Sequence, residues 1–214
     1  MSSWHDFFPQ FLPGLWVTLR LTLGGLLFGL PLGVALAVVT TSSWRLAKWA
    51  GIGIVELGRG TPGLIVLYLV YYGLPQAGLT LRDITAATVA LSFTTSAYTS
   101  EIFRAGLVAV PQGQREASRA LGLSPWKELR LVVLPQALRI VIPPLIGWAI
   151  ILYQGTSLAF AISVPELLSR AYNAGSITFQ YGSALALAGL MYAVVSLSAT
   201  GLAGWSRSRA TTSH

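Results

Sequence analysis

The stretch VPQGQREASRALGLSPWKELRLVVLP, from Val110 to Pro135, is a polar segment between long apolar runs. It holds six formal charges, in a chain that is 54% hydrophobic and only 10% charged. Pro111 fits the first turn of a helix, because its missing N–H would have no partner there. Gly122 can adopt the left-handed conformation that ends a helix. A first helix is therefore predicted between these two residues, and a second follows with Ser124 as its N-cap and Pro125 at its first position.

This stretch resembles the EAA loop in the membrane subunits of ABC importers. The family pattern is Glu-Ala-Ala, three residues, Gly, nine residues, Ile, one residue and Leu-Pro, and here it begins at Glu116 and ends at Pro135. Ser118 replaces the second Ala and Val132 replaces Ile, and both replacements are similar in size. A pattern of this length is specific. The alternative is an amphipathic hairpin that only connects two membrane spans.

The resemblance implies a role for this loop, which in that family is the cytoplasmic coupling helix and sits in a cleft of the ATP-hydrolysing subunit. It also implies the type I ABC-importer permease fold, an all-α integral membrane architecture. Glu116 would meet a basic residue of the ATPase, and the small residues after it would allow a close approach. The residues expected to couple to the ATPase are Arg115, Glu116, Ala117, Ser118, Arg119 and Gly122.

The composition of the chain points to a membrane protein. Its mean hydropathy is +0.66, and its apolar fraction exceeds the roughly 45–50% that is usual for soluble domains. The absence of Cys excludes disulfides and thiolate metal sites, and no metal site is expected. A net charge of +7 is compatible with nucleic acid binding, but the basic residues lie in short segments between apolar runs. That distribution is typical of contact with anionic lipid, so membrane lipid is an expected partner and nucleic acid is not.

Five apolar stretches are long enough to cross a membrane, which takes about 20 residues. The expected spans are approximately 14–39, 52–74, 84–106, 140–162 and 184–205, in a single transmembrane domain that covers residues 1–214 with the coupling loop at 110–135.

Basic residues between the spans predict the orientation. The side that holds the coupling loop has ten of them, and the other side has Arg82 and Arg170. The ten are Arg45, Lys48, Arg104, Arg115, Arg119, Lys127, Arg130, Arg139, Arg207 and Arg209. Because basic segments stay in the cytoplasm, the C-terminus is expected inside and the N-terminus outside the bacterial inner membrane.

Further short stretches extend the resemblance along the chain, to the polar amino-acid branch of the family with its histidine, glutamine and glutamate permeases. They are LWVTLRLTL at 15–23, ELGRGTP at 56–62, YYGLP at 71–75, AYTSEIFRAG at 97–106, LPQALR at 134–139 and VPELL at 164–168. Such permeases work as dimers of like or unlike halves, with two ATPases and an external binding protein. The resemblance therefore implies a subunit that forms the translocation path for an amino acid, a polar one in that branch, which the binding protein delivers.

Two alternatives to amino-acid import remain open from the sequence. A permease for another small solute, such as an opine, would share every motif above. A secondary transporter would show an inverted repeat and charged residues at mid-membrane, and neither is present in the sequence.

The sequence contains no recognisable enzyme motif. It has no GxxxxGK[ST], HExxH or GxSxG pattern, and its two histidines are His5 and His214. The chain is therefore expected to be a non-catalytic subunit without a cofactor of its own, and ATP and Mg²⁺ would be bound by the partner ATPase.

Two regularities concern how the spans pack and end. Gly25, Gly29 and Gly33 recur every four residues, which permits close contact between helices and is interpreted as packing within the bundle rather than a dimer seam. Two acid–base pairs with a spacing of three, Glu56 with Arg59 and Glu101 with Arg104, are expected to meet at one cytoplasmic mouth.

The segment WAIILYQGTSL, at 148–158, resembles a family stretch that ends in Lys-Asp-Thr-Ser-Leu and is preceded by Asn-Glu. Here Gln154 and Gly155 replace the charged pair, and Gly147 and Trp148 replace Asn-Glu. A charged substrate deep in the membrane would need formal charges or many dipoles. The groups that this chain offers to a substrate are neutral: Thr94, Tyr98, Gln154, Thr156 and Ser157. The chain is therefore expected to pair with a different, second permease subunit, and a homodimer for a neutral amino acid is the alternative.

Overall fold

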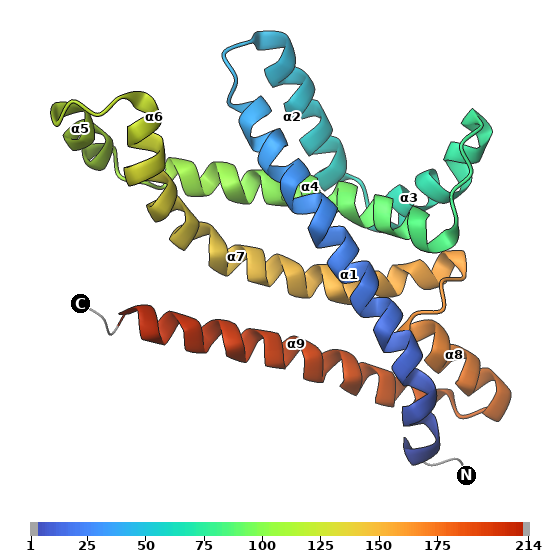
Figure 1. Cartoon of the computed structure of the whole chain (residues 1–214). Helices are drawn as coiled ribbons and strands as arrows, with labels where there is room; N and C mark the ends of the chain where they lie inside the picture. The colour runs from blue at the N-terminus through green and yellow to red at the C-terminus, as the bar shows by residue number, and fades with distance from the viewer. Residues whose placement is uncertain (1–3, 212–214) are drawn as a thin grey trace.

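The computed structural model describes residues 4–211, with side chains described as far as Gly201, and this part of the chain consists of helices and turns (Figure 1). The elements are α1 (Trp4–Thr40), α2 (Arg45–Gly60), α3 (Gly63–Tyr68), η1 (Leu69–Gly73), η2 (Leu74–Ala77), α4 (Asp83–Val108), α5 (Gln112–Ala120), α6 (Pro125–Glu128), η3 (Leu129–Val133), α7 (Leu134–Gly155), η4 (Thr156–Ile162), α8 (Leu167–Thr178) and α9 (Tyr181–Thr211). The turns η1 and η3 are π-helical, and η2 and η4 are 3₁₀. The prediction of an all-α chain is confirmed.

Three helical segments in the described residues are long and apolar enough to cross a membrane by themselves: Trp4–Thr40, Pro125–Ile162 and Tyr181–Gly201. A fourth is obtained if Arg45–Gly60 and Gly63–Ala77 are counted as one broken span. Helix α4 has 26 residues and is about 39 Å long, enough to cross, but its many hydroxyl side chains lower its hydropathy. A count of five spans therefore stays a prediction.

The predicted span 52–74 is interrupted in the structure. Helix α2 and the helical segment Gly63–Ala77, which begins with α3, meet at 107°, and the bend lies at Thr61 and Pro62. Thr61 is extended, with φ −93° and ψ 129°, because a proline disfavours the helical conformation in the residue before it. The apolar run is continuous in sequence, but the helix is not.

Helix α1 crosses the other long helices and packs along α4 (Figure 1). A Cβ atom placed on Gly29 would lie 2.5 Å from the Cβ of Thr95, and one placed on Gly33 would overlap Thr99. The glycine repeat therefore brings the two backbones together, and its interpretation as packing within the bundle is confirmed. On the facing surface the Thr99 hydroxyl donates to the Thr95 carbonyl at 2.7 Å, whereas the buried Thr95 hydroxyl has no hydrogen-bond partner among the described residues.

The end of the bundle that holds the start of α1 has its own core, in which the first turns of α1 pack on α8 and α9. Phe7 and Phe11 are buried there beside Leu167. Glu166 is fully buried and caps α8, accepting hydrogen bonds from the backbone N–H of Ser169 at 2.7 Å and from the Tyr192 hydroxyl at 2.8 Å. A buried carboxylate with several donors at a helix N-terminus is a strong cap.

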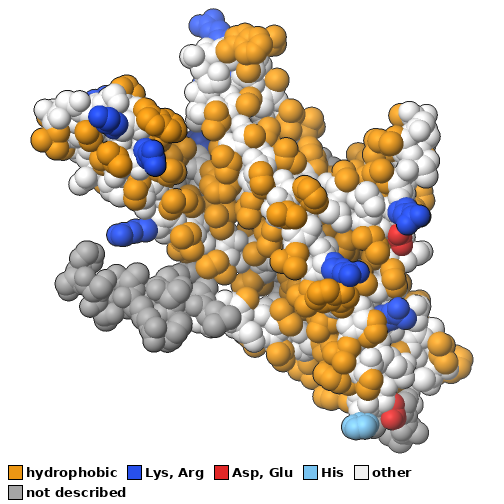
Figure 2. Space-filling model, viewed as in Figure 1, with side chains coloured by type: hydrophobic (Ala, Val, Ile, Leu, Met, Phe, Trp, Pro, Cys, Tyr) orange, Lys and Arg blue, Asp and Glu red, His pale blue; other side chains and the backbone are white. Residues whose placement is uncertain are grey.

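The long helices carry large apolar side chains on their outer surface. Leu27 of α1 is 68% exposed, and Figure 2 shows apolar side chains over much of this face with only scattered basic ones among them. So much exposed apolar surface indicates contact with lipid. Arg207 and Arg209, which contribute to the predicted charge asymmetry, lie outside the residues whose side chains are described.

Candidate functional site

The polar stretch folds as a helix, a corner and a second helix, as predicted. Helix α5 follows Pro111, and Gly122 has a φ of +74°. The N–H of Gly122 donates to the Arg119 carbonyl at 2.9 Å, and the N–H of Leu123 donates to the Ser118 carbonyl at 3.1 Å. Both hydrogen bonds occupy carbonyls at the end of α5, so the corner is a regular left-handed helix terminus. Helix α6 then begins with a proline in its first turn.

A buried carboxylate braces the two helices of the loop. Glu128 of α6 is 6% exposed and accepts from Arg119 of α5 at 2.8 and 3.3 Å, and Arg115 lies 3.9 Å away. The hydrogen bond from Arg119 holds the pKa of the Glu128 carboxyl below its ordinary value, and the positive charges of both arginines act in the same direction. The loop is thus held as one unit.

The predicted coupling residues divide into an outer and an inner set. Glu116 and Ala117 are exposed, and the Glu116 carboxylate accepts from the Gln112 amide at 2.8 Å. Ser118 is buried and donates to the Arg115 carbonyl at 2.8 Å, and Arg115 itself donates to the Leu107 carbonyl at 2.8 Å. The outer residues can meet a partner, whereas the inner ones hold α5 against the end of α4.

The loop also exposes two large apolar side chains that are not part of the EAA motif. Leu121 is 82% exposed and Trp126 is 67% exposed. They flank the Gly122 corner in sequence, and buried aromatic and aliphatic anchors dominate the energy of most protein interfaces. Their large apolar side chains within an otherwise polar stretch are the signal in the sequence that points to them.

The two acid–base pairs come together, as expected. Arg59 lies 3.7 Å from Glu56 and 4.0 Å from Glu101. Glu101 also accepts two hydrogen bonds from Arg104, at 3.0 and 2.7 Å. Glu56, Glu101 and Arg104 line a cavity of about 510 Å³, together with Lys48.

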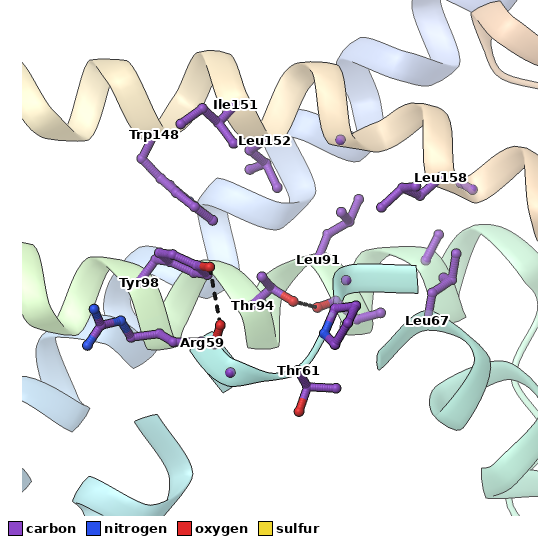
Figure 3. A pocket seen from close by; sticks show the side chains of 17 residues that line it. Arg59, Thr61, Leu67, Leu91, Thr94, Tyr98, Trp148, Ile151, Leu152 and Leu158 are labelled. Carbon is purple, nitrogen blue, oxygen red and sulfur yellow. Dashed lines mark hydrogen bonds between the residues drawn. The ribbon is translucent and has the colours of Figure 1, made fainter. Parts of the chain in front are cut away.

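A second cavity, of about 420 Å³, lies where α2 breaks into α3, against α4, α7 and η4 (Figure 3). Thr94 and Tyr98, two of the predicted substrate-path residues, line it. The Tyr98 hydroxyl donates to the Arg59 carbonyl at 3.3 Å, and the Trp148 ring stacks on the Tyr98 ring with 4.2 Å between centroids. The broken helix thus exposes backbone beside an aromatic pair.

The other three predicted path residues do not line this cavity. The Gln154 amide donates to the Ser196 hydroxyl of α9 at 3.4 Å. Thr156 is buried and donates to the Tyr153 carbonyl at 2.7 Å, and Ser157 donates to the Gln154 carbonyl at 2.8 Å. The 3₁₀ turn η4 follows α7 directly, and these three side chains bond to α7 or α9 around that junction.

Trp148 of α7 forms the wall of the cavity that the sequence led us to expect from Gln154, Thr156 and Ser157. It lines the cavity and is 9% exposed. The replacement of the family's Asn-Glu by Gly147 and Trp148 marks this position in the sequence. The sequence alone does not show that the indole stacks on Tyr98.

A family model described as the binding-protein-dependent transport system inner membrane component matches residues 29–212. The chain belongs to this family. The permease is 37% identical over 190 residues to the arginine transport system permease protein ArtQ of Bacillus subtilis (strain 168). The aligned region covers 88% of this chain and 87% of ArtQ. It is 34% identical over 209 residues to the glutamate/aspartate import permease protein GltK of Escherichia coli O157:H7, which covers 94% and 93%.

Solved structures agree with this assignment. The permease matches a chain in the crystal structure of an amino acid ABC transporter with histidines, with a TM-score of 0.92 and 32% identity over 98% of this chain and 100% of that chain. A chain of the inward-facing MetNI methionine ABC transporter matches with a TM-score of 0.71 and 24% identity, covering 94% and 97%, which shows the shared fold. The resemblance to amino-acid ABC permeases and the type I importer fold are both confirmed, and the secondary-transporter alternative is removed.

Proposed function

We propose that this permease forms one half of the translocation path of an ATP-driven importer for an amino acid. The observation that carries the proposal is the braced coupling loop, which presents Glu116, Leu121 and Trp126 outward at one end of the bundle. A rigid element there can transmit a movement of a partner ATPase to α4 and α7, to which the loop is directly joined. The cavity at the helix break lies between the same two helices.

The partners follow from this assignment. The membrane subunit of a binding-protein-dependent importer works with ATPase subunits and an external binding protein. We propose two ATPases, which hold ATP and Mg²⁺, because the sequence of this chain has no nucleotide-binding motif. The chain itself would be non-catalytic.

An amino acid is the proposed cargo because the relatives of this chain carry arginine, glutamate and aspartate in their names. An importer for an opine or a similar small solute is the second candidate, since it would share the same motifs. Uptake assays with both classes of solute, using the binding protein encoded beside the permease, distinguish the two.

The proposed orientation puts the coupling loop in the cytoplasm and the N-terminus outside, on the strength of the basic residues. Because the chain has no Cys, single cysteines report position cleanly. We expect Leu79→Cys to react with an impermeant thiol reagent added to intact cells, and Leu121→Cys to react only after lysis. Both positions are exposed in the structure. The reverse pattern would refute the orientation.

The proposed coupling is tested by ATP-driven uptake in proteoliposomes that contain the complete transporter. Gly122→Ala places a side chain at a φ of +74°, which costs about 1 kcal/mol or more. Glu116→Ala removes the exposed carboxylate. We expect both variants to lose most uptake while the complex still binds ATP.

The matched control is Gly113→Ala, because Gly113 lies inside α5 with open space around its Cα and an ordinary helical backbone. This variant should transport like the native chain. If the Gly122→Ala variant and the Glu116→Ala variant both took up the substrate at the native level, the role proposed for the loop would be contradicted.

A further inference from the structure

The cavity at the helix break has an unusual lining for a site that would handle a polar amino acid. Among its described lining residues, Arg59 alone carries a formal charge. Apolar side chains make up most of the rest, including Leu67, Leu91, Ile151 and Leu152, and Figure 3 shows Leu91 and Leu152 facing the cavity from opposite helices. A volume of about 420 Å³ is within the range of small-molecule sites.

Two hydroxyl groups in this lining, those of Thr94 and Tyr98, already donate their protons to backbone carbonyls. Thr94 donates to the Ala90 carbonyl at 3.1 Å, and Tyr98 donates to the Arg59 carbonyl at 3.3 Å. The Trp148 indole nitrogen is buried without a hydrogen-bond partner in the described structure. A buried unpaired donor is destabilising, so stability of the fold alone does not explain a tryptophan here.

The aromatic pair offers no open face to a cation. One face of the Tyr98 ring is covered by Trp148, at 4.2 Å between centroids and 16° between planes. The Arg59 guanidinium lies over the ring at 5.9 Å from its centroid, and Figure 3 places Tyr98 between these two residues. A cationic substrate side chain would therefore meet an arginine where it would need a ring face or a carboxylate.

Arg59 remains able to bind an anion. Its distances to Glu56 and Glu101, 3.7 and 4.0 Å, are those of ion pairs without hydrogen bonds. A carboxylate that entered the cavity could accept hydrogen bonds from the guanidinium, which matches carboxylate geometry. Glu101 is already hydrogen-bonded to Arg104, so a ligand carboxylate would compete mainly with Glu56 for the Arg59 guanidinium, and a second carboxylate on the same ligand would have no counter-charge.

We infer that this cavity binds an amino acid with an apolar side chain, with its carboxylate toward Arg59 and its side chain among the leucine and isoleucine residues of α4 and α7. The inference rests on the proposed function and narrows it, because the polar branch of the family implied a polar cargo. Arginine or lysine would bury a charge without a counter-charge in this half. Glutamate or aspartate would bury one carboxylate too many.

The test is direct ligand binding to the complete transporter in lipid nanodiscs, without the binding protein, by isothermal titration calorimetry. We expect leucine to bind at least about tenfold more tightly than arginine or glutamate, a ratio that a single unpaired buried group commonly produces. Trp148→Glu places a carboxylate in the cavity and should shift the preference toward arginine by about tenfold or more. Trp148→Phe should keep the native order.

Gln154→Glu is the matched control, because it adds the same charge to the same helix at a side chain that faces Ser196 and not the cavity. It should leave the leucine preference unchanged. If Trp148→Glu does not assemble, Trp148→Ala replaces it and should strengthen phenylalanine binding relative to leucine, because it enlarges the cavity.

Tighter binding of arginine or glutamate than leucine by the native complex would overturn the inference, and so would an unchanged preference in Trp148→Glu. Either result leaves the proposed function intact if the same complex imports an amino acid in proteoliposomes. A complex that imports no amino acid with its own binding protein would instead refute the proposed function.

Discussion

At the scale of single residues, Gly29 and Gly33 of α1 make a close approach to α4. We expect Gly29→Ala to destabilise the permease by about 1–3 kcal/mol, because the added methyl must push Thr95 and the backbone of α4 away. The measurement is the melting temperature of the purified complex, followed by intrinsic tryptophan fluorescence.

Gly189→Ala is the matched control, since Gly189 lies inside α9 with nothing within 4 Å of the added methyl. It should be neutral or slightly stabilising, because alanine favours a helix over glycine. Equal melting temperatures for the two variants would mean that α1 and α4 are not packed as described.

These residues show how far local sequence reasoning reaches. The spacing of the glycines predicted a close helix contact, because positions four apart share a helix face. It could not name α4 as the partner, since that depends on how the whole bundle is arranged. Trp148 is the opposite case, because its departure from the family pattern was visible but its stacking on Tyr98 required the fold.

At the scale of elements, the coupling loop depends on the buried Glu128. We expect Glu128→Gln to loosen the loop, because Arg119 and Arg115 would then face a neutral amide. Hydrogen exchange of the amides in 112–133 should become several-fold faster at neutral pH, and transport per ATP hydrolysed should fall. Glu116→Gln is the control for exchange, because this exposed carboxylate does not join α5 to α6.

The pH dependence has a definite sign. A depressed pKa in the folded loop means that the contribution of Glu128 is complete above the ordinary carboxyl pKa of about 4.3 and is lost as pH falls through the lower, folded value. Near neutral pH the native loop should thus show no titration of this brace. The exchanged pair, Arg119→Glu with Glu128→Arg, should restore protection, and continued fast exchange in it would argue against a brace by charge.

Elements with strong local signals were predictable, and one without a clear signal was not. Pro111, Gly122 and Pro125 fixed α5, the corner and the start of α6, because each restricts its own backbone. The break between α2 and α3 also has a local cause in Pro62. Hydropathy does not reveal this break, because the apolar run continues on both sides of it and hydropathy carries no information on helix direction.

At the scale of the whole molecule, the cavity joins parts of the chain that are far apart in sequence. Arg59 comes from α2, Tyr98 from α4 and Trp148 from α7 (Figure 3). The sequence predicted α4 as one wall through Thr94 and Tyr98, but it placed the second wall at Gln154, Thr156 and Ser157. Trp148 and Gln154 are separated by nearly two turns of α7. No periodicity within such an apolar helix reveals which of its surfaces faces the path.

The charges in the cavity lining also indicate what kind of second permease subunit completes the importer. No acidic side chain lines the cavity among the described residues, so the ammonium group of an amino acid finds no counter-charge in this half. Two copies of the chain would repeat this shortage, whereas a different permease subunit can supply the missing carboxylate. We therefore expect a heterodimer.

Native mass spectrometry of the tagged chain, purified with its co-expressed neighbours, should give one copy of it and one copy of a second permease. As a check, two differently tagged copies of this chain should not purify together. An active complex with two copies of this chain and no other permease would contradict the expectation.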